Sequence, residues 1–380
     1  MNDIFFKPDH IKLREHLLDF LKTELEPIRK ELSKENKIPI FLIRKLGENA
    51  YFGPLISEKY GGSNLGMIAH CLITEEISKL NVAVSVTRTP CILDGYLLFH
   101  YGDEIQKETY LAEIASGKKI CSICVTEEEA GSNVAGIKTT ARISGNEYVL
   151  NGSKKFITNA GIADYYFIWC ITNDKVNPRS GMSVFLVEKD TPGLSIENPY
   201  ELMGINGIYN GILHLNNVKI SQENLIGEEG SGFDSLMDTF NVERMTLSSE
   251  CNGISLAALD DAKKYAKTRI QFDKPISKFQ ITKLKIADMA INLQAARLLT
   301  YNAAKLYEKG YNVTKEASMA KAFSSTTALR IASEALQIHG GDGYTDVYQV
   351  ERYMRDARFF QIGGGTTEIQ KLIVAREELR

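Results

Sequence analysis

The sequence predicts a multidomain α+β protein in which a helical segment, a β segment and a second helical segment follow one another. Apolar residues recur every three or four positions up to about residue 120, alternate with polar residues as far as 227, and return to helical spacing afterwards. The 380 residues suffice for two or three domains, and 44% hydrophobic with 24% charged residues is typical of a globular protein. We therefore expect domains at 1–120, 121–227 and 228–380.

The charge balance argues against nucleic acid as a partner. The formal net charge is -3, and lysines and arginines are spread along the chain rather than clustered. The first residues lack the basic-then-apolar order of a secretory signal. The most apolar long segment, 81–99, is interrupted by Arg88 and Asp94. We expect a cytoplasmic protein without a membrane span.

Cysteine and histidine spacing gives little support for a metal site. Of six cysteines, only Cys121 and Cys124 have Cys-x-x-Cys spacing, and the six histidines are scattered. The run around these two cysteines has the alternation of a strand. Buried free thiols are the expected state, with no metal and no disulfide.

The β segment begins with two hairpin signals in TTARISGNEYVLNGSKKFIT, at Ser144-Gly145-Asn146 and at Asn151-Gly152. Just before it, CVTEEEAGSN places hydroxyls and a glycine at the exit of a strand. Thr126 there can hydrogen-bond a heteroaromatic ring, and Gly131 with Ser132 can admit a phosphate close to the backbone. Taken alone, a polar turn after a strand is the better explanation of this stretch.

The last segment carries two apolar stripes at helical spacing. One contains Leu284, Ile291 and Leu298, and the other contains Ile286 and Leu293. Apolar faces on both sides fit a helix inside a bundle, or a bundle that also packs on another subunit.

Six motifs together resemble the acyl-CoA dehydrogenase family, in the same order and at the same separations along nearly the whole chain. They are CVTEEEAGSN, NGSKKFITNAG, LIGEEGSGF, TRIQFDKPISKFQ, LQIHGGDGY and MRDARFFQIGGGTTEIQ. The resemblance implies an N-terminal helical domain, a β-barrel-like middle domain and a C-terminal four-helix bundle. It also implies a homotetramer with FAD bound between subunits.

The resemblance assigns the FAD contacts to two sets of residues. The set around the flavin ring and the pyrophosphate of one subunit comprises Val125, Thr126, Gly131, Ser132, Phe156 and Thr158. The neighbouring subunit would hold the adenosine and pyrophosphate end through Arg269, Gln271, Phe272, Gln337 and Gly341, and the turn near the C-terminus would add Thr366 and Glu368. Arg269 also makes independent chemical sense, because a guanidinium pairs bidentately with phosphate.

Several positions depart from the pattern of the family. Glu128 replaces a proline and Asn133 an aspartate in the first motif, which implies a slightly altered flavin site. In MGINGIYNG the family more often has arginine, serine and threonine at the places of Asn206, Ile208 and Asn210. This second departure weakens the transfer of thioester-tail contacts to that stretch.

The chemistry of the family requires a carboxylate beside the α carbon, because an α proton leaves while a hydride passes from Cβ to flavin N5. Many members carry this glutamate immediately before the Gly-Thr of the last motif, where this chain has Gly364. Enzymes that resemble isovaleryl-CoA and long-chain acyl-CoA dehydrogenases instead place a glutamate before the arginine that opens a bundle helix. FNVERMTL has Glu243 before Arg244 in this way.

Glu243 is therefore predicted to be the base, although a charge pair on a helix is more often merely solvated. Gly364 would leave room for its carboxylate, and the Gly364 N–H would donate to the thioester oxygen together with a flavin ribityl hydroxyl. Arg244 and Asn241 are predicted to lie towards the substrate.

The leading functional hypothesis is FAD-dependent α,β-dehydrogenation of a short or branched acyl thioester on CoA. Prolyl-carrier-protein dehydrogenases and oxidases are similar, so an aminoacyl thioester on a carrier protein is the alternative. A catalytically inactive flavin-binding protein is a third hypothesis. The electron acceptor is left open between an electron-transfer flavoprotein and oxygen.

Overall fold

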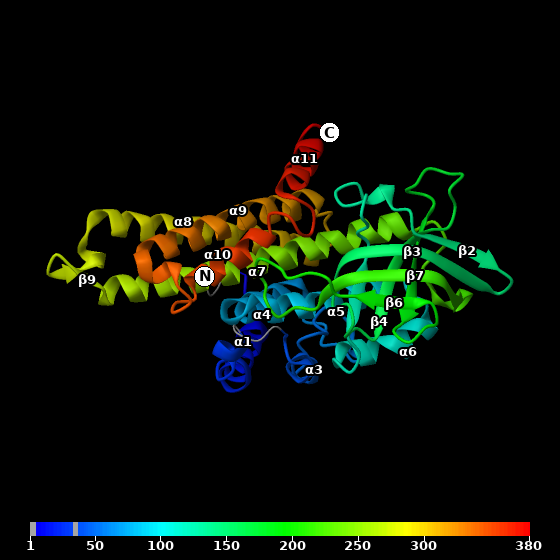
Figure 1. The fold of residues 1–380 in the computed structure, drawn as a ribbon, viewed down its shortest axis with the longest axis horizontal. Helices are drawn as coiled ribbons and strands as arrows, with labels where there is room; N and C mark the ends of the chain where they lie inside the picture. Colours follow the sequence, from blue (N-terminus) through cyan, green and yellow to red (C-terminus); the bar gives the residue numbers. More distant parts are fainter. Residues whose placement is uncertain (1–4, 33–36) are drawn as a thin grey trace.

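The computed structural model describes residues 5–32 and 37–380, and it contains the three predicted segments in order (Figure 1). A sheet domain lies at one end of the molecule, a helical bundle extends to the other end, and the N-terminal helices pack beneath the middle. The N-terminal helices are α1 Pro8–Phe20, α2 Arg29–Leu32, α3 Ile40–Glu48, α4 Gly66–Leu80, α5 Val82–Tyr101 and α6 Glu104–Ala115.

Helix α5 is an interior helix of this protein. By length and composition it could cross a membrane, but 94% of its most apolar window is buried inside the structure. Asn81 caps its start by accepting hydrogen bonds from the N–H groups of Ala83 and Val84. The fully buried Arg88 donates to the carbonyl of Tyr51 at 2.9 Å, so its charge is solvated by the protein.

The middle segment forms one mixed sheet in the strand order β6-β7-β3-β2-β4-β5-β8, with β1 parallel to β4. The strands are β1 Cys121–Cys124, β2 Thr140–Ser144, β3 Glu147–Thr158, β4 Tyr165–Ile171, β5 Met182–Glu188, β6 Leu194–Glu197, β7 Asn210–Ser221 and β8 Leu225–Ile226. Every residue of β4 is buried. Phe167 and Trp169 pack into the core shared with the helices, whereas Ile168 and Cys170 pack into the sheet domain's own core. Both faces of β4 are therefore covered.

One of the two hairpin signals is correct and the other is wrong. Ser144 and Glu147 close the β2–β3 hairpin as predicted. Asn151 and Gly152 instead lie inside β3, where the pairing with β7 shifts its register. Gly152 has φ +147° and packs against Thr139, so this glycine serves a β-bulge rather than a turn.

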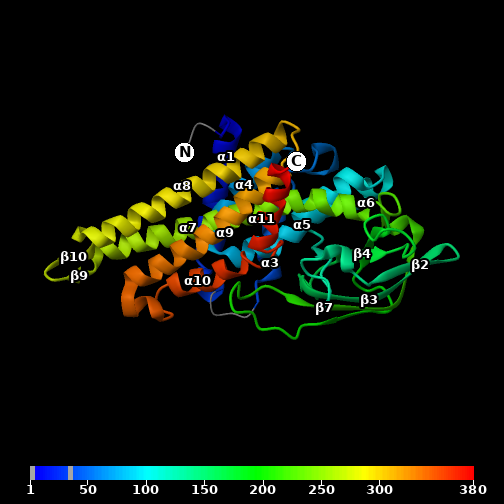
Figure 2. The same cartoon turned by 90° about the horizontal axis from the view of Figure 1, so that it is seen from above.

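Helix α7 runs through the whole molecule and joins its parts (Figure 2). Its 37 residues span roughly 55 Å and contact α4, α5, α8 and α9. The C-terminal elements are α7 Gly232–Thr268, β9 Ile270–Gln271, β10 Lys274–Pro275, α8 Gln280–Glu308, α9 Thr314–His339, α10 Val350–Phe359 and α11 Thr367–Glu378. Helices α7 to α10 pack together as the four-helix bundle, whereas α11 projects from it along α9 (Figure 1).

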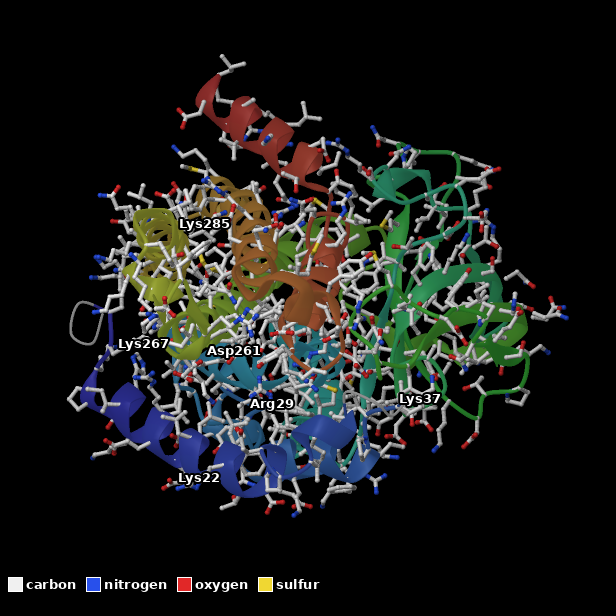
Figure 3. The ribbon with its side chains drawn as sticks, turned by 60° about the vertical axis from the view of Figure 1, so that its left-hand side comes forward. Lys22, Arg29, Lys37, Asp261, Lys267 and Lys285 are labelled. Atoms are coloured by element: carbon white, nitrogen blue, oxygen red, sulfur yellow. The ribbon has the colours of Figure 1, made fainter. Side chains whose placement is uncertain are left out.

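A buried polar link fastens the N-terminal helices to the bundle. The Arg29 guanidinium donates to the Tyr353 hydroxyl at 2.8 Å, and this hydroxyl donates to Asp261 at 2.9 Å. Figure 3 shows Arg29 and Asp261 near one another, between the N-terminal helices and the bundle. The link joins α2, α10 and α7.

Two observations bear on the predictions of burial. All six cysteines are free and buried, as expected. Leu284, Ile291 and Leu298 of the first apolar stripe on α8 are exposed in the single chain, whereas Leu293 of the second stripe is buried. The exposed stripe remains available for another subunit.

A buried ion pair holds the loop after β1 against β3. The Lys154 side chain is fully buried, and its ammonium group donates to Glu127 at 2.7 Å and to the Val125 carbonyl at 3.1 Å. Glu127 also accepts hydrogen bonds from the N–H groups of Lys138 and Thr139. All the polar atoms of the pair are thus engaged in fixing this loop.

We expect Lys154→Met to destabilise the protein by about 3–5 kcal/mol, because it leaves the Glu127 carboxylate buried without its cation. The neighbouring Lys155 forms an exposed pair with Glu128, so Lys155→Met is a matched control with an expected cost below about 1 kcal/mol. Thermal unfolding of the two variants measures the difference. Equal melting temperatures would contradict the structural role of the pair.

Candidate active site

Glu243 and the glycine turn meet at one half-buried point. A Cβ atom placed on Gly364 would lie 3.4 Å from the carboxyl carbon and from Oε1 of Glu243. The same atom would lie 2.0 Å from Cδ1 of Leu247, one turn further along α7. Gly364 also has φ +62°, which a residue with a side chain rarely adopts. Glycine therefore relieves both backbone strain and crowding against Leu247 at this position.

The carbonyls of the glycine turn are bound by two buried side chains. Gln370 donates to the carbonyls of Gly364 and Gly365, each at 3.1 Å, and the Lys321 ammonium group donates to Gly365. Within residues 5–32 and 37–380, nothing accepts a hydrogen bond from the N–H of Gly364. This N–H is free to donate to a ligand beside Glu243.

The surroundings of Glu243 favour a carboxyl group that binds and releases a proton. Burial raises the pKa of Glu243 above its ordinary value, and the charges of Lys321 and Arg244 oppose that rise. Glu243 makes no ion pair or hydrogen bond with another residue in the described part of the chain. Its carboxylate is thus free of competing partners.

Arg244 lies inside α7 rather than at the start of a helix, and Asn241 lies one turn before it. Arg244 is buried and donates to the side-chain oxygen of Asn241 at 2.7 Å. Its Nε is buried and has no partner among the described residues. Burial lowers the pKa of Arg244 to about 10, against the attraction of Glu243. The guanidinium therefore remains charged at neutral pH and keeps one donor free.

The residues predicted to contact the flavin ring come from two adjoining segments, the exit of β1 and the end of β3. The N–H of Lys155 donates to the carbonyl of Thr126 at 2.8 Å, which ties the segments together. The ring of Phe156 is 53% exposed and lies 5.0 Å from that of Tyr200, and Ile157 between Phe156 and Thr158 is buried. Val125 is buried.

Features of the loop fit a bound cofactor. The hydroxyls of Thr126, Ser132 and Thr158 make no hydrogen bond to another residue that the structure describes. A Cβ atom on Gly131 would meet nothing within 4 Å. Packing within the chain thus does not explain this glycine, and a phosphate can approach its backbone closely.

The β9–β10 hairpin, which carries part of the second predicted set, lies at the opposite end of the molecule from the sheet domain (Figure 1). Arg269, Gln271 and Phe272 belong to the β9–β10 hairpin, whose turn at Phe272 and Asp273 has positive φ at both residues. The Phe272 side chain is 86% exposed.

Gln337, near the end of α9, and Gly341, just after that helix, are also exposed. One chain therefore does not bring the two FAD sets together.

The turn near the C-terminus has its own roles in the fold. The Thr366 hydroxyl caps α11 by accepting a hydrogen bond from the N–H of Ile369 at 3.3 Å. Glu368 lies in the first turn of α11, where a carboxylate is favourable. Both residues follow the glycine turn directly.

The divergent stretch at 203–211 packs on α10. Asp356 accepts a hydrogen bond from the N–H of Ile205 at 2.6 Å. Asn206 is exposed, whereas Ile208 and Asn210 are buried. Nothing in the structure explains the replacement of the residues more usual at these three positions.

Three family models together match almost the entire chain. They are described as the N-terminal, middle and C-terminal domains of acyl-CoA dehydrogenase, and they match residues 7–118, 122–218 and 230–379. The chain belongs to the acyl-CoA dehydrogenase family. It is accordingly a flavin-dependent oxidoreductase acting on CH–CH bonds.

Curated relatives of this family member span nearly its full length. An acyl-CoA dehydrogenase of Bacillus subtilis is 39% identical over 97% of each chain. A 3-(aryl)acrylate reductase of Clostridium sporogenes is 39% identical over 99% of this chain and 100% of the relative. The caffeyl-CoA reductase-Etf complex subunit CarC of Acetobacterium woodii is 38% identical over 98% of each chain.

Solved structures of the family share the fold throughout. Butyryl-CoA dehydrogenase from Megasphaera elsdenii is 35% identical with a TM-score of 0.97 over 100% of both chains. A structure described as PigA with FAD and proline is 28% identical with a TM-score of 0.96 over 99% of both chains. The prolyl acyl carrier protein oxidase AnaB is 30% identical with a TM-score of 0.91, over 98% of this chain and 99% of that one. The cofactor of this family member is FAD.

Sequence reasoning missed three residues that shape the surroundings of Glu243. Leu247, Lys321 and Gln370 lie within apolar or mixed helical patterns and belong to three different helices, α7, α9 and α11. A lysine fully buried in a bundle helix is rare enough to mark a site, but its burial is visible only after folding.

We expect Gly131→Val to leave the fold intact, because the added side chain meets no protein atom, and to lower FAD occupancy severalfold by blocking approach to the backbone. The FAD content of purified protein, read from its visible absorbance, is the measurement. Ser144→Val at the β2–β3 turn serves as a folded control. Full FAD occupancy in Gly131→Val would show that this loop does not contact the cofactor.

Proposed function

We propose that this enzyme oxidises a short or branched acyl thioester between Cα and Cβ with Glu243 as the base. The observation that carries the proposal is the position of the Glu243 carboxylate, whose carbon and Oε1 lie 3.4 Å from the place that a Cβ atom on Gly364 would take. A carboxylate at this point occupies the space in which the commoner glutamate of the family would stand. The raised pKa of Glu243, caused first by burial, supports the same role.

In this mechanism the thioester lies against the glycine turn with its α carbon facing Glu243. The carboxylate takes the α proton, and the free N–H of Gly364 donates to the thioester oxygen as negative charge develops there. Bound FAD supplies the acceptor for the hydride that leaves Cβ. Leu247 lies against one side of the turn, at the place that a side chain on Gly364 would take.

The turn of α7 that contains Asn241 and Arg244 is proposed to hold the thioester's tail. Arg244 keeps a charged guanidinium with a free Nε donor next to the base, and Asn241 orients that guanidinium. A charged donor at this place suits a carbonyl or phosphate oxygen of the tail.

The relatives support CoA as the carrier of the acyl group. Those acting on CoA thioesters by name, such as butyryl-CoA dehydrogenase, are more similar in sequence than the carrier-protein oxidase AnaB. An aminoacyl group on a carrier protein is the second candidate, favoured by the structural likeness to PigA and AnaB. Parallel anaerobic incubation with butyryl-CoA, isovaleryl-CoA and a prolyl carrier protein distinguishes them by which one bleaches the flavin.

Partners are proposed from the same comparisons and from the exposed surfaces. The subunit name of CarC supports an electron-transfer flavoprotein as redox partner, with oxygen as the alternative acceptor. Two of the relatives are named as reductases, and the same residues would then return the proton to Cα. The exposed α8 stripe and the separation of the two FAD sets support a homotetramer with FAD between subunits.

We expect Glu243→Gln to retain FAD and to slow bleaching by the best thioester about a hundredfold or more, because the amide cannot accept the α proton. Stopped-flow absorbance under anaerobic conditions measures the rate. Lys371→Gln, an exposed change on α11, is the control. A loss of less than about tenfold would make Glu243 the wrong base, and no bleaching by wild type with any thioester would favour the inactive flavoprotein.

Moving the base tests the geometry of the contact. The double variant that combines Glu243→Gly with Gly364→Glu is expected to stay inactive, because the new glutamate side chain clashes with Leu247. Adding Leu247→Ala makes room, and we expect this triple variant to recover bleaching at least about tenfold over Glu243→Gly. No recovery in a folded, FAD-loaded triple variant would show that the two positions do not serve one carboxylate site.

A further inference from the structure

Lys321 lies where three parts of the proposed active site come together. Its side chain is almost fully buried on α9, and its ammonium group donates to the carbonyl of Gly365 in the glycine turn. Its positive charge also opposes the rise in the pKa of Glu243 that burial causes. The proposed mechanism gives this lysine no chemical step.

Its burial needs a reason. Ordering a lysine in the interior costs side-chain entropy and desolvation of a charge, which proteins accept only when the charge is paired or hydrogen-bonded. No carboxylate within the described residues forms an ion pair with Lys321 at 4 Å or less. Among the described residues, the one hydrogen bond of its ammonium group goes to the carbonyl of Gly365 in the turn. The hydrogen bond to the Gly365 carbonyl therefore offsets part of the cost of burying this lysine.

We propose that Lys321 is a positioning residue, which fixes the glycine turn through the Gly365 carbonyl and keeps the Glu243 carboxylate ionised beside it. This inference rests on the proposed role of Glu243. Lys321 and Gln370 bind the Gly365 carbonyl, which belongs to the peptide plane after that residue, and Gln370 also binds the Gly364 carbonyl in the plane before it. The Gly364 N–H lies in the next plane towards the N-terminus, so restraint of these two planes limits its movement and favours its position beside the thioester oxygen.

The electrostatic part of the role depends on all the groups near these two side chains. Glu243 is faced by Lys321 from α9 and has Arg244 and Glu250 on its own helix. Lys321 is faced by Glu243, Arg244 and the neutral thiol of Cys251 on α7, and by Glu368 on α11.

Burial lowers the pKa of Lys321 to about 8, so it carries its charge at neutral pH. Glu243 must be ionised to act, and activity rises with pH through its pKa. Because the cation lowers that pKa, its removal moves the acid limb to higher pH.

The test uses FAD-loaded enzyme and butyryl-CoA, with the limiting bleaching rate measured across pH. Lys321→Met is expected to slow the reaction about tenfold or more and to move the acid limb upward by about one pH unit or more. Lys321→Arg keeps the charge, so its acid limb should stay in place. Gln370→Leu loosens the turn without removing a charge and should lower the rate with the acid limb unmoved.

Lys315→Met removes an exposed lysine of the same helix and should change neither quantity. The proposal is overturned if a folded, FAD-loaded Lys321→Met enzyme keeps the wild-type rate and pH profile, or if Gln370→Leu moves the acid limb equally. If Lys321→Met fails to fold, the bleaching rates and acid limbs of Lys321→Arg and Gln370→Leu are compared with those of the wild type by the same criteria. Normal activity of Glu243→Gln would instead refute the base assignment, which is a separate outcome.

Discussion

The active-site arrangement depends on the contact between helix α7 and a turn that has no side chain at Gly364. Helix α7 starts against the sheet domain, where the indole N–H of Trp169 donates to the carbonyl of Gly232 at 2.9 Å. Glu243 follows eleven residues later, roughly 17 Å along the helix. The same helix therefore relates Glu243, the proposed base, to the sheet domain that carries the residues predicted to contact the flavin ring. Its later turns pack in the bundle.

Polar groups continue along this side of α7 beyond the base. Glu250, two turns after Glu243, accepts hydrogen bonds from Ser85 at 2.9 Å and Thr89 at 3.0 Å on α5. Burial raises the pKa of Glu250 to about 7, and its second oxygen has no partner among the described residues. The carboxylates of Glu243 and Glu250 are stabilised by nearby cations, Lys321 and Arg88 respectively, and Glu250 also by its hydrogen bonds.

The sequence predicted those features that local chemistry determines. The change of hydrophobic period predicted the order of helical and sheet domains, and Ser144-Gly145-Asn146 predicted a hairpin. Asn151-Gly152 predicted a second hairpin wrongly, because a glycine with positive φ is suited to a β-bulge as well as to a turn. Lys321 and Gln370 could not be recognised because their partners lie 44 and 6 residues away, and only tertiary packing shows that a lysine is buried against a turn. The residue roles proposed for FAD remain predictions.

Exchange of α protons measures the central claim without depending on hydride transfer. A 3-thia acyl-CoA has α protons but no hydrogen to give up from its third position, so incubation in D₂O reports the base alone. The account predicts that the FAD-loaded wild-type enzyme exchanges the α protons, and that Glu243→Gln does so about a hundredfold more slowly. Equal exchange rates in the two proteins would show that another group removes the proton.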